Sequence, residues 1–174
     1  MNPLSMAESE SIAALSEALV SELIEAGRSV SVAESCTGGW IAKALTDISG
    51  SSQCFGYGIV SYSNGAKESM LGVRPKILGE HGAVSEAVVG EMAQGILNLS
   101  GADYAVAVSG IAGPEGGTEE KPVGTVWLGW AVRKGKKTSI DAEKHLIKGD
   151  REAVRSRTVI LAMQGVRERL RKNG

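Results

Sequence analysis

The amino-acid sequence predicts an α/β fold with three layers, α/β/α, in which helices cover both faces of a mixed β-sheet. The first part of the chain alternates short apolar segments with helical patterns, an order typical of parallel strands joined by helices. Toward the C-terminal end, two strand-like segments flank the basic, glycine-containing turn Arg133–Lys137, which predicts an antiparallel hairpin. Because the chain shows no internal repeat and no linker-like stretch, we expect residues 1–174 to form one domain, with residues 1–8 flexible.

Composition and charge narrow the class of protein. With 174 residues, 43% of them hydrophobic and 22% charged, the chain is long and apolar enough to bury a core of its own. A formal net charge of −1 provides no basic excess for binding nucleic acid or an anionic membrane. The two cysteines are too few for a disulfide framework, and no cysteine–histidine cluster has the spacing of metal ligands.

The sequence carries no evident targeting or membrane segment. Residues 1–10 lack the basic region and apolar stretch of a signal peptide, and no apolar run approaches the roughly 20 residues that span a bilayer. We therefore expect a cytoplasmic protein without a membrane partner.

Helical and strand-like patterns alternate near the N-terminus. A helix is expected to begin near Ser9 and to end at Gly27. The apolar residues that recur there at helical spacing are Ile12, Leu15, Leu19 and Leu23. The apolar segment Val30–Ala33 predicts a strand, and Gly38–Gly39 opens the next helix, over Trp40–Thr46.

A second strand and two helices follow in the middle of the chain. Phe55–Tyr62 alternates larger residues with small ones and predicts a strand. Asn64–Leu71 fits a short helix, which Gly72 and Pro75 are expected to end. From Ser85 on, apolar residues recur at helical spacing and predict a longer helix.

The last part of the chain predicts a central strand, a hairpin and a final helix. Tyr104–Val108 is apolar throughout, as in a strand that is buried on both faces. The long glycine-rich loop Gly110–Pro122 separates it from the hairpin strands Val123–Val132 and Thr138–Ile147. Asp150 can cap the final helix. The inward-facing residues of that helix are expected to be Val159, Met163, Val166 and Leu170.

Three loops follow predicted strands directly and are candidates for a binding site. They are Ser35–Gly39, Ser61–Lys67 and Ser109–Pro122. Ligands of open α/β sheets bind beyond the carboxyl ends of the strands, so we expect these loops to meet at one edge of the sheet.

Ser35 stands between a strand and a helix start, where backbone N–H groups lack partners. Gly38 and Gly39 would let the chain pass close to a ligand, and the free N–H groups could bind an oxyanion or a phosphate. Ser35 is therefore a candidate nucleophile. The pattern alone leaves a second interpretation open, in which Ser35 or Thr37 only caps the helix.

Lys67 falls in the first turn of a predicted short helix, at the positive end of the helix dipole. That position, together with burial, would lower the lysine pKa and make a neutral amine available. A neutral lysine can accept the proton of a serine hydroxyl in place of histidine. The spacing alone also fits a solvated surface lysine.

Other reactive residues offer weaker alternatives. His81 and His145 have no evident acidic partner in the sequence, and a structural or surface role explains each of them. Cys36 would be the intrinsically better nucleophile beside Ser35, but it also fits an inert buried thiol. The loop Ser109–Thr118 could wrap a phosphate or a ribose, although it lacks the ending of a Walker loop.

Five short motifs stand in order along the chain. They are Glu34–Gly39, Tyr62–Lys67, His81–Ser85, Gly110–Pro114 and Lys121–Val126. In this order they resemble the CinA C-terminal domain family, over almost the whole chain from about Leu15 to Leu170. Several motifs in series are far more specific than any one of them alone.

The resemblance implies an activity, since the family includes nicotinamide-nucleotide amidohydrolases. These hydrolyse nicotinamide mononucleotide (NMN) to nicotinate mononucleotide and ammonia, a salvage step in pyridine nucleotide (NAD) recycling. The resemblance implies no metal and no other cofactor, a small-molecule nucleotide substrate, and a homodimer or other homo-oligomer. Full-length relatives carry a further N-terminal domain, so this chain is expected to be the stand-alone form.

The resemblance also implies roles for particular residues. Ser35 matches the nucleophile and Lys67 the general base, together a Ser–Lys dyad, while Tyr62 matches a tyrosine that helps to hold the dyad and the ligand. Ser109 stands where many members carry threonine, so the hydroxyl is kept and a methyl group is lost. Arg151 matches an arginine that meets the nucleotide phosphate; from the pattern alone, a salt bridge or solvent exposure also explains it.

Backbone groups complete the expected site. The N–H groups around Thr37, Gly38 and Gly39 are candidates for the oxyanion hole, and Gly110 and Gly113 are expected to bind substrate. Two other functions stay open from the sequence: a non-catalytic nucleotide-binding or regulatory module on the same fold, and an amidase for a different substrate.

Overall fold

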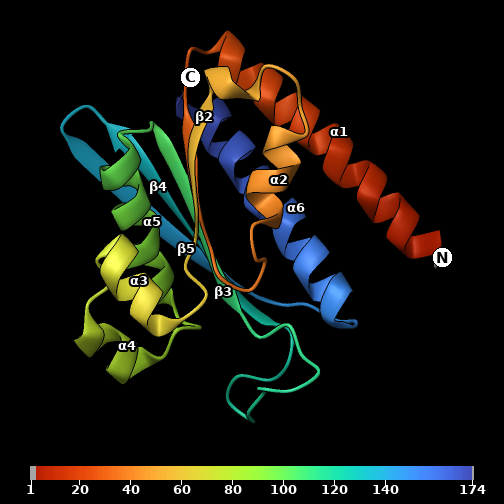
Figure 1. The fold of residues 1–174 in the computed structure, drawn as a ribbon, viewed down its shortest axis with the longest axis vertical. Helices are drawn as coiled ribbons and strands as arrows, with labels where there is room; N and C mark the ends of the chain where they lie inside the picture. Colours follow the sequence, from red (N-terminus) through yellow and green to blue (C-terminus); the bar gives the residue numbers. More distant parts are fainter. Residues whose placement is uncertain (1–2, 174) are drawn as a thin grey trace.

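The computed structural model describes the backbone of residues 3–173 and the side chains of residues 12–173. Its centre is a five-stranded sheet with the strand order β2-β1-β3-β4-β5 (Figure 1). The strands span Val30–Glu34 (β1), Phe55–Val60 (β2), Tyr104–Gly110 (β3), Thr125–Lys134 (β4) and Lys137–Leu146 (β5). β1, β2 and β3 run parallel, whereas β4 pairs antiparallel with β3 and with β5, so the sheet is mixed as predicted.

Helices cover both faces of this sheet. They span Pro3–Glu25 (α1), Trp40–Thr46 (α2), Asn64–Leu71 (α3), Pro75–His81 (α4), Glu86–Ser100 (α5) and Arg151–Asn173 (α6), with a 3₁₀ turn at Ser51–Gln53 (η1). Helices α1, α2 and α6 lie together on one face, and α3, α4 and α5 lie on the other (Figure 1). This arrangement confirms the predicted three-layer α/β/α fold.

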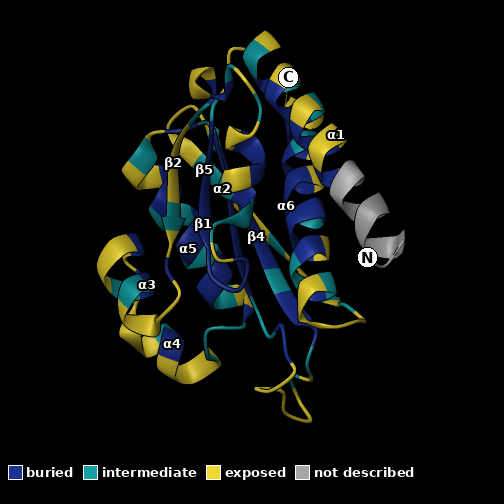
Figure 2. Ribbon diagram, turned by 45° about the vertical axis from the view of Figure 1, so that its right-hand side comes forward, coloured by how far each residue is buried: buried dark blue, intermediate teal, exposed yellow. Residues whose placement is uncertain are grey.

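Buried residues, dark blue in Figure 2, lie between the sheet and the helices on both of its faces, and apolar side chains form one cluster on each face. The central strand β3 contributes side chains to both clusters, because successive residues of a strand point to opposite faces of the sheet. Val106 belongs to the cluster that includes Met163 of α6, whereas Ala107 belongs to the cluster that includes Met92 of α5. The expectation that Tyr104–Val108 is buried on both faces is confirmed, and β3 gives the site at its end a rigid base.

Several element boundaries differ from the sequence predictions. α1 begins at Pro3, earlier than the start expected near Ser9, and of the residues expected to be flexible, 1–2 lie outside the described part of the chain. β4 begins at Thr125, later than the predicted Val123, because the chain turns just before it: Thr125 N–H donates to the carbonyl of Pro122 at 3.0 Å, and Gly124 has a positive φ angle. β5 ends at Leu146, one residue before the predicted Ile147.

Two more differences bear on the site. β2 ends at Val60, short of the predicted Tyr62, because the next two carbonyls turn away to accept hydrogen bonds from a lysine side chain. Pro75 does not end a helical region but begins α4, since proline fits the first turn of a helix. His81 is the last residue of α4.

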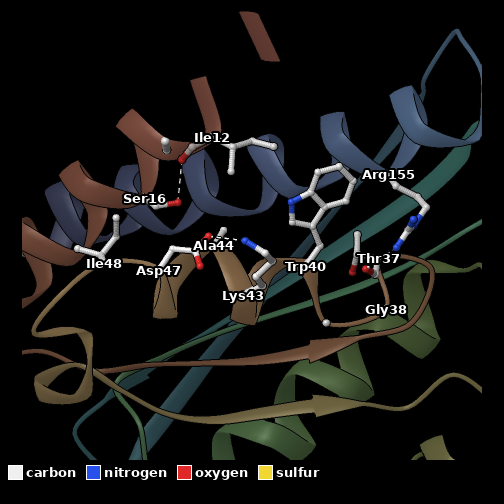
Figure 3. Close-up of a pocket in the computed structure, with 12 residues that line it drawn as sticks. Ile12, Ser16, Thr37, Gly38, Trp40, Lys43, Ala44, Asp47, Ile48 and Arg155 are labelled. Atoms are coloured by element: carbon white, nitrogen blue, oxygen red, sulfur yellow. Dashed lines mark hydrogen bonds and ion pairs between the residues drawn. The ribbon is translucent and has the colours of Figure 1, made fainter. Parts of the chain in front are cut away.

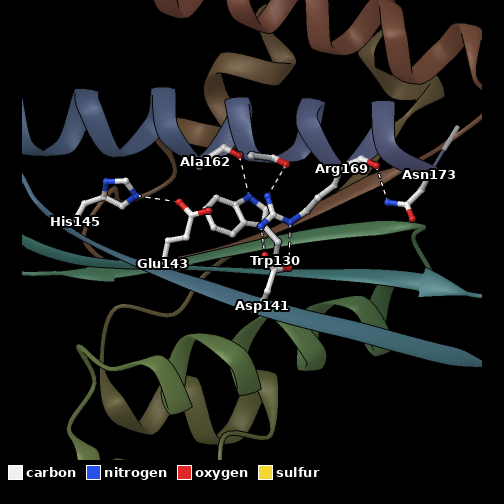
Figure 4. A network of polar contacts seen from close by, with 8 residues as sticks. Trp130, Asp141, Glu143, His145, Ala162, Arg169 and Asn173 are labelled. Atoms are coloured by element: carbon white, nitrogen blue, oxygen red, sulfur yellow. Dashed lines mark hydrogen bonds and ion pairs between the residues drawn. The ribbon is translucent and has the colours of Figure 1, made fainter.

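A partly buried polar network ties α6 to the last two strands (Figure 4). The guanidinium of Arg169 stacks on the indole of Trp130, 4.0 Å from the ring centroid, and pairs with Asp141 of β5. The Trp130 indole N–H donates to the carbonyl of Ala162 at 3.2 Å. The network fixes α6 on the sheet, and with it the first turns of α6, which reach the candidate site.

Candidate active site

A cavity of about 310 Å³ lies at the carboxyl ends of the three parallel strands. Each of the three loops predicted to converge contributes to its lining: Ser35 after β1, Tyr62 after β2, and the segment from Ser109 to Gly113 at the end of β3. Lys67 of α3 and Arg151 of α6 complete its polar wall. The size falls at the lower end of the range of about 300–1,000 Å³ that small-molecule sites occupy.

Ser35 occupies a sharp turn between β1 and α2. Its N–H extends the sheet by donating to the carbonyl of Val108 at 3.1 Å, while its own carbonyl accepts from the N–H of Gly38 at 3.1 Å. Gly38 and Gly39 both have positive φ angles, 61° and 100°, a conformation that glycine adopts without strain. The turn thus presents the Ser35 hydroxyl, with the residue 8% exposed, to the cavity.

The cap of α2 comes from Glu34, which overturns the interpretation of Ser35 or Thr37 as the helix cap. The Glu34 carboxylate is fully buried and accepts hydrogen bonds from the N–H groups of Ile41 (2.9 Å) and Ala42 (3.0 Å) in the first turn of α2. It also accepts the Thr37 hydroxyl at 2.6 Å. Because Glu34 satisfies these amides, the Ser35 hydroxyl is not needed as a cap.

Lys67 meets Ser35 inside the protein. The Lys67 side chain is only 1% exposed, so the interpretation as a solvated surface lysine is wrong. Its Nζ lies 3.0 Å from Ser35 Oγ, 2.8 Å from the carbonyl oxygen of Ser61 and 3.2 Å from that of Tyr62. Burial of the amine holds the pKa of Lys67 below the ordinary value of a lysine, because desolvation disfavours the charged form.

These three contacts determine how a neutral Lys67 would be oriented. A neutral amine has two N–H donors and one lone pair, whereas a backbone carbonyl can only accept. The carbonyls of Ser61 and Tyr62 therefore take both N–H groups. The lone pair is left facing Ser35 Oγ, in the orientation that accepts the hydroxyl proton.

Cys36 also lines the cavity, but its thiol is poorly suited to attack. Burial is the main cause that raises the pKa of Cys36 to about 11, with a further contribution from the Glu34 carboxylate. The thiol is therefore protonated at neutral pH, and the thiol form is a weak nucleophile. This agrees with the interpretation of Cys36 as an inert buried thiol.

Ser109, Tyr62 and Arg151 stand around the dyad. Ser109 is buried at the end of β3 and lines the cavity. Arg151 Nη1 donates to the carbonyl of Gly113 at 2.8 Å, and its Nη2 donates to the Tyr62 hydroxyl at 3.4 Å. The Tyr62 side chain is exposed at the rim; its backbone carbonyl, rather than its ring, touches Lys67. Gly110 lines the same cavity beside Ser109.

Three of the expected substrate-binding residues lie elsewhere. Thr37, Gly38 and Gly39 line a second cavity, of about 620 Å³, on the opposite side of the turn between α1, α2 and α6 (Figure 3). The Gly38 N–H is already bonded to the carbonyl of Ser35, so it cannot also donate to a ligand in the first cavity. In this geometry the three residues shape the turn and do not line the cavity at Ser35.

Sequence reasoning missed several residues of the site. Asn64, Val84 and Glu115 line the cavity. The only sequence signal for them is that they lie within or next to the five motifs shared with the family. Arg155 binds the turn that follows Ser35, where its Nε donates to the carbonyl of Cys36. The sequence signal that could have revealed it is its spacing of one helical turn from Arg151.

The histidines stand apart from this cavity. His81 lines a different one beside α5, and His145 lies on β5 with Nε2 3.2 Å from Glu143 Oε2. Among the residues whose side chains are described, no group of three or more His, Cys, Asp and Glu residues could hold a metal ion. In the described part of the chain, every helix is too short or too polar to cross a membrane.

Comparison with known proteins places the chain among close relatives. The model of the CinA C-terminal domain matches residues 12–170. The nicotinamide-nucleotide amidohydrolase PncC of Escherichia coli K12 is 51% identical over 159 residues, 91% of this chain and 94% of the relative. The PncC of Enterobacter agglomerans is 54% identical over 144 residues, 83% and 86% of the two chains. A crystal structure of a competence-damaged protein (CinA) superfamily member from Klebsiella pneumoniae superposes with a TM-score of 0.86 at 42% identity, covering 92% and 98%.

Proposed function

The chain belongs to the CinA C-terminal domain family, and on this premise we propose that it is a nicotinamide-nucleotide amidohydrolase acting through Ser35 and Lys67. It hydrolyses the carboxamide of NMN to nicotinate mononucleotide and ammonia, a step of pyridine nucleotide salvage. The relatives at 51–54% identity carry this activity in their names. The observation that carries the proposal is the contact of 3.0 Å between the buried Lys67 Nζ and Ser35 Oγ.

In the first half of the reaction, Lys67 takes the proton of Ser35 as Oγ attacks the carboxamide carbon. The tetrahedral intermediate bears a negative oxygen, which needs N–H donors. The Cys36 N–H is the candidate, because it directly follows the proposed nucleophile. Lys67 then passes its proton to the leaving nitrogen, the C–N bond of the tetrahedral intermediate breaks, and ammonia departs, leaving an acyl ester on Ser35.

In the second half, water cleaves that ester. Lys67, neutral again, takes a proton from the water as its oxygen attacks the acyl carbon, and returns the proton to Ser35 Oγ when the ester breaks. The products are nicotinate mononucleotide and free Ser35. The fixed carbonyls of Ser61 and Tyr62 hold the amine in the same orientation through both halves.

The rim of the cavity supplies a place for the phosphate of NMN. Arg151 uses one N–H for the carbonyl of Gly113 and one for the Tyr62 hydroxyl, and a guanidinium has five. Its remaining donors can form charge-assisted hydrogen bonds to a phosphate. Gly110 and Gly113 let the backbone of this loop lie close to the substrate, and Ser109 offers a hydroxyl beside the dyad.

A cytoplasmic location and a homodimer belong to the same proposal. Cys36 and Cys54 are free, buried thiols, as a reducing compartment favours.

β2 is an edge strand that carries no charged residue and exposes Tyr57 and Val60. Such an edge favours pairing with a second copy of the chain. Light scattering after gel filtration is expected to show a dimer for the wild type and a monomer for Tyr57→Lys.

Ammonia release by the purified protein tests the proposed activity. NMN is expected to be hydrolysed faster than nicotinamide riboside or nicotinamide, and Lys67→Met is expected to reduce the NMN rate by at least roughly 10⁴-fold. Preference for another amide would sink the substrate assignment. Saturable NMN binding without ammonia release would instead identify a non-catalytic nucleotide-binding module on the same fold.

A further inference from the structure

The turn that carries the nucleophile, residues 35–39, is held from two sides. Inside the protein, the Glu34 carboxylate binds the Thr37 hydroxyl and the start of α2. From the other side, Arg155 of α6 reaches across to the turn: Nε donates to the carbonyl of Cys36 and Nη2 to that of Thr37, both at 3.1 Å. Figure 3 shows the Arg155 side chain descending from α6 to Thr37 and Gly38 beside Trp40.

The Arg155 contact fixes two successive peptide groups. Nε and Nη2 form one edge of a rigid planar guanidinium, so both carbonyls are bound by a single group. In a trans peptide the N–H points opposite to the carbonyl, and the N–H groups of Thr37 and Gly38 therefore face away from Arg155. The Gly38 N–H closes the turn by donating to the carbonyl of Ser35.

Arg155 is itself held in place. Its guanidinium lies 5.5 Å from the centroid of the Trp40 ring, within the range of a cation–π contact. It stands one helical turn after Arg151, which binds the loop carbonyl of Gly113. The start of α6 thereby holds both the nucleophile turn and the loop at the mouth of the cavity.

We propose that Arg155 is a positioning residue for Ser35. By binding the Cys36 and Thr37 carbonyls, it keeps Ser35 Oγ in line with Lys67, and it keeps the Cys36 N–H directed toward the oxyanion. The inference rests on the proposed amidase function and adds a residue to its machinery that touches neither the substrate nor the dyad. A misplacement of about 1 Å in such a site can cost about 100-fold in rate.

The fold does not depend on Arg155 alone. Thr37 and Arg155 line the second cavity, about 620 Å³ in size, where water can replace the guanidinium as donor to the Thr37 carbonyl. Glu34 continues to cap α2 without it. Arg155→Ala is therefore expected to fold, with the turn free to shift.

Steady-state kinetics with NMN test the positioning role. Arg155→Ala is expected to lower kcat by about 100-fold while KM stays within about threefold, because the residue orients the nucleophile and does not bind substrate. Arg157→Ala, an exposed arginine on the same helix, is the matched control and is expected to behave as wild type. A kcat for Arg155→Ala within about threefold of wild type, or a loss confined to KM, would overturn the inference.

Chemical rescue separates positioning from a general loss of structure. The hole left by Arg155→Ala opens into the second cavity, so millimolar guanidinium is expected to restore part of kcat in this variant and none in Arg157→Ala. Absence of rescue in a variant with the thermal unfolding midpoint of wild type would count against the proposal. If Arg155→Ala does not fold, Arg155→Lys takes its place, and since one ammonium cannot replace the fork, kcat is again expected to fall.

Labelling of Ser35 distinguishes failure of this inference from failure of the proposed function. A fluorophosphonate reacts with an activated serine and needs no NMN. Wild type is expected to be labelled on Ser35, and Arg155→Ala more slowly, by about the same factor as its loss in kcat. Equal labelling of the two would reject the role of Arg155 even if NMN is not the substrate. If Arg155→Ala is labelled more slowly but the wild type does not turn over NMN, only the assignment of NMN as substrate is rejected.

Discussion

Gly95 of α5 lies so close to Leu71 of α3 that a Cβ atom on Gly95 would stand 2.0 Å from the Leu71 carbonyl oxygen. No side chain fits into that space, and the backbones of the two helices are therefore in direct contact. Leu71 is one helical turn beyond Lys67 on α3. The missing side chain at Gly95 thus determines how near the proposed base can approach Ser35.

Gly95→Ala is expected to push α3 away from α5 and to move Lys67 relative to Ser35. We expect a fall in kcat of up to about 100-fold and a loss of stability of about 1–3 kcal/mol. Gly90→Ala is the control on the same helix, because a Cβ there would meet Ile140 at an ordinary 3.7 Å. Kinetics and urea unfolding measure both effects; wild-type kcat in a folded Gly95→Ala would refute this view of α3.

The pH dependence of kcat/KM reports the protonation of Lys67. Burial lowers the pKa of this amine, and only the neutral form can take the Ser35 proton, so activity is expected to rise with pH to a plateau. The midpoint is expected below the ordinary pKa of a lysine. Lys67→Arg is expected to stay inactive at every pH, because a guanidinium does not lose its proton. Activity that falls as pH rises through this region would contradict a lysine base.

Arg151 is expected to act on the phosphate and not on the chemistry. Arg151→Ala removes charge-assisted hydrogen bonds worth roughly 1.5–3 kcal/mol, and KM for NMN is expected to rise about 10- to 100-fold. Nicotinamide riboside lacks the phosphate, and its kcat/KM is expected to change little. Initial-rate measurements on both substrates make the comparison, and an equal loss for the two would remove the phosphate contact from Arg151.

The sequence was sufficient to predict the layers, the mixed sheet and the convergence of three loops, because each depends on local patterns and on the rule that parallel strands end at one edge. It could not show whether Ser35 or Thr37 caps α2. The cap is Glu34, whose buried carboxylate binds the first turn of α2 through hydrogen bonds up to eight residues along the chain. Burial of Lys67 likewise follows from tertiary structure, since its Nζ reaches Ser35, 32 residues earlier in the chain.

The substrate-binding residues show a second limit of sequence reasoning. Thr37–Gly39 adjoin the nucleophile in sequence, but the turn directs them to the opposite side, where they line the second cavity. Arg155 approaches the same turn from a helix more than a hundred residues away, and only its spacing of one helical turn from Arg151 hints at this contact in the sequence. Tertiary packing, and not adjacency in the sequence, decides which side of a turn faces the cavity.

Gly165 and Trp130 provide a test of stability at a position that does not line the candidate site. A Cβ on Gly165 would lie 2.3 Å from the indole ring, which is fixed by the stacked Arg169 (Figure 4). Gly165→Ala is expected to lower the free energy of unfolding by about 1–3 kcal/mol. Gly79→Ala, in a helix with open space around it, is expected to cause no loss. Chemical denaturation measures the free energy of unfolding of each variant. Equal values for Gly165→Ala and wild type would show that the core adapts to the added methyl group.

The account as a whole depends on which of two neighbouring side chains attacks the carboxamide. Ser35 touches the base, whereas burial keeps the Cys36 thiol protonated with a pKa of about 11. The most direct measurement is NMN turnover by Ser35→Ala and Cys36→Ala under the same conditions, with acid-quenched samples fragmented to locate the acyl ester. The account predicts that Ser35→Ala loses turnover and ester, while Cys36→Ala keeps both, with the ester on Ser35. Turnover that survives in Ser35→Ala, or an acyl group found on Cys36, would contradict it.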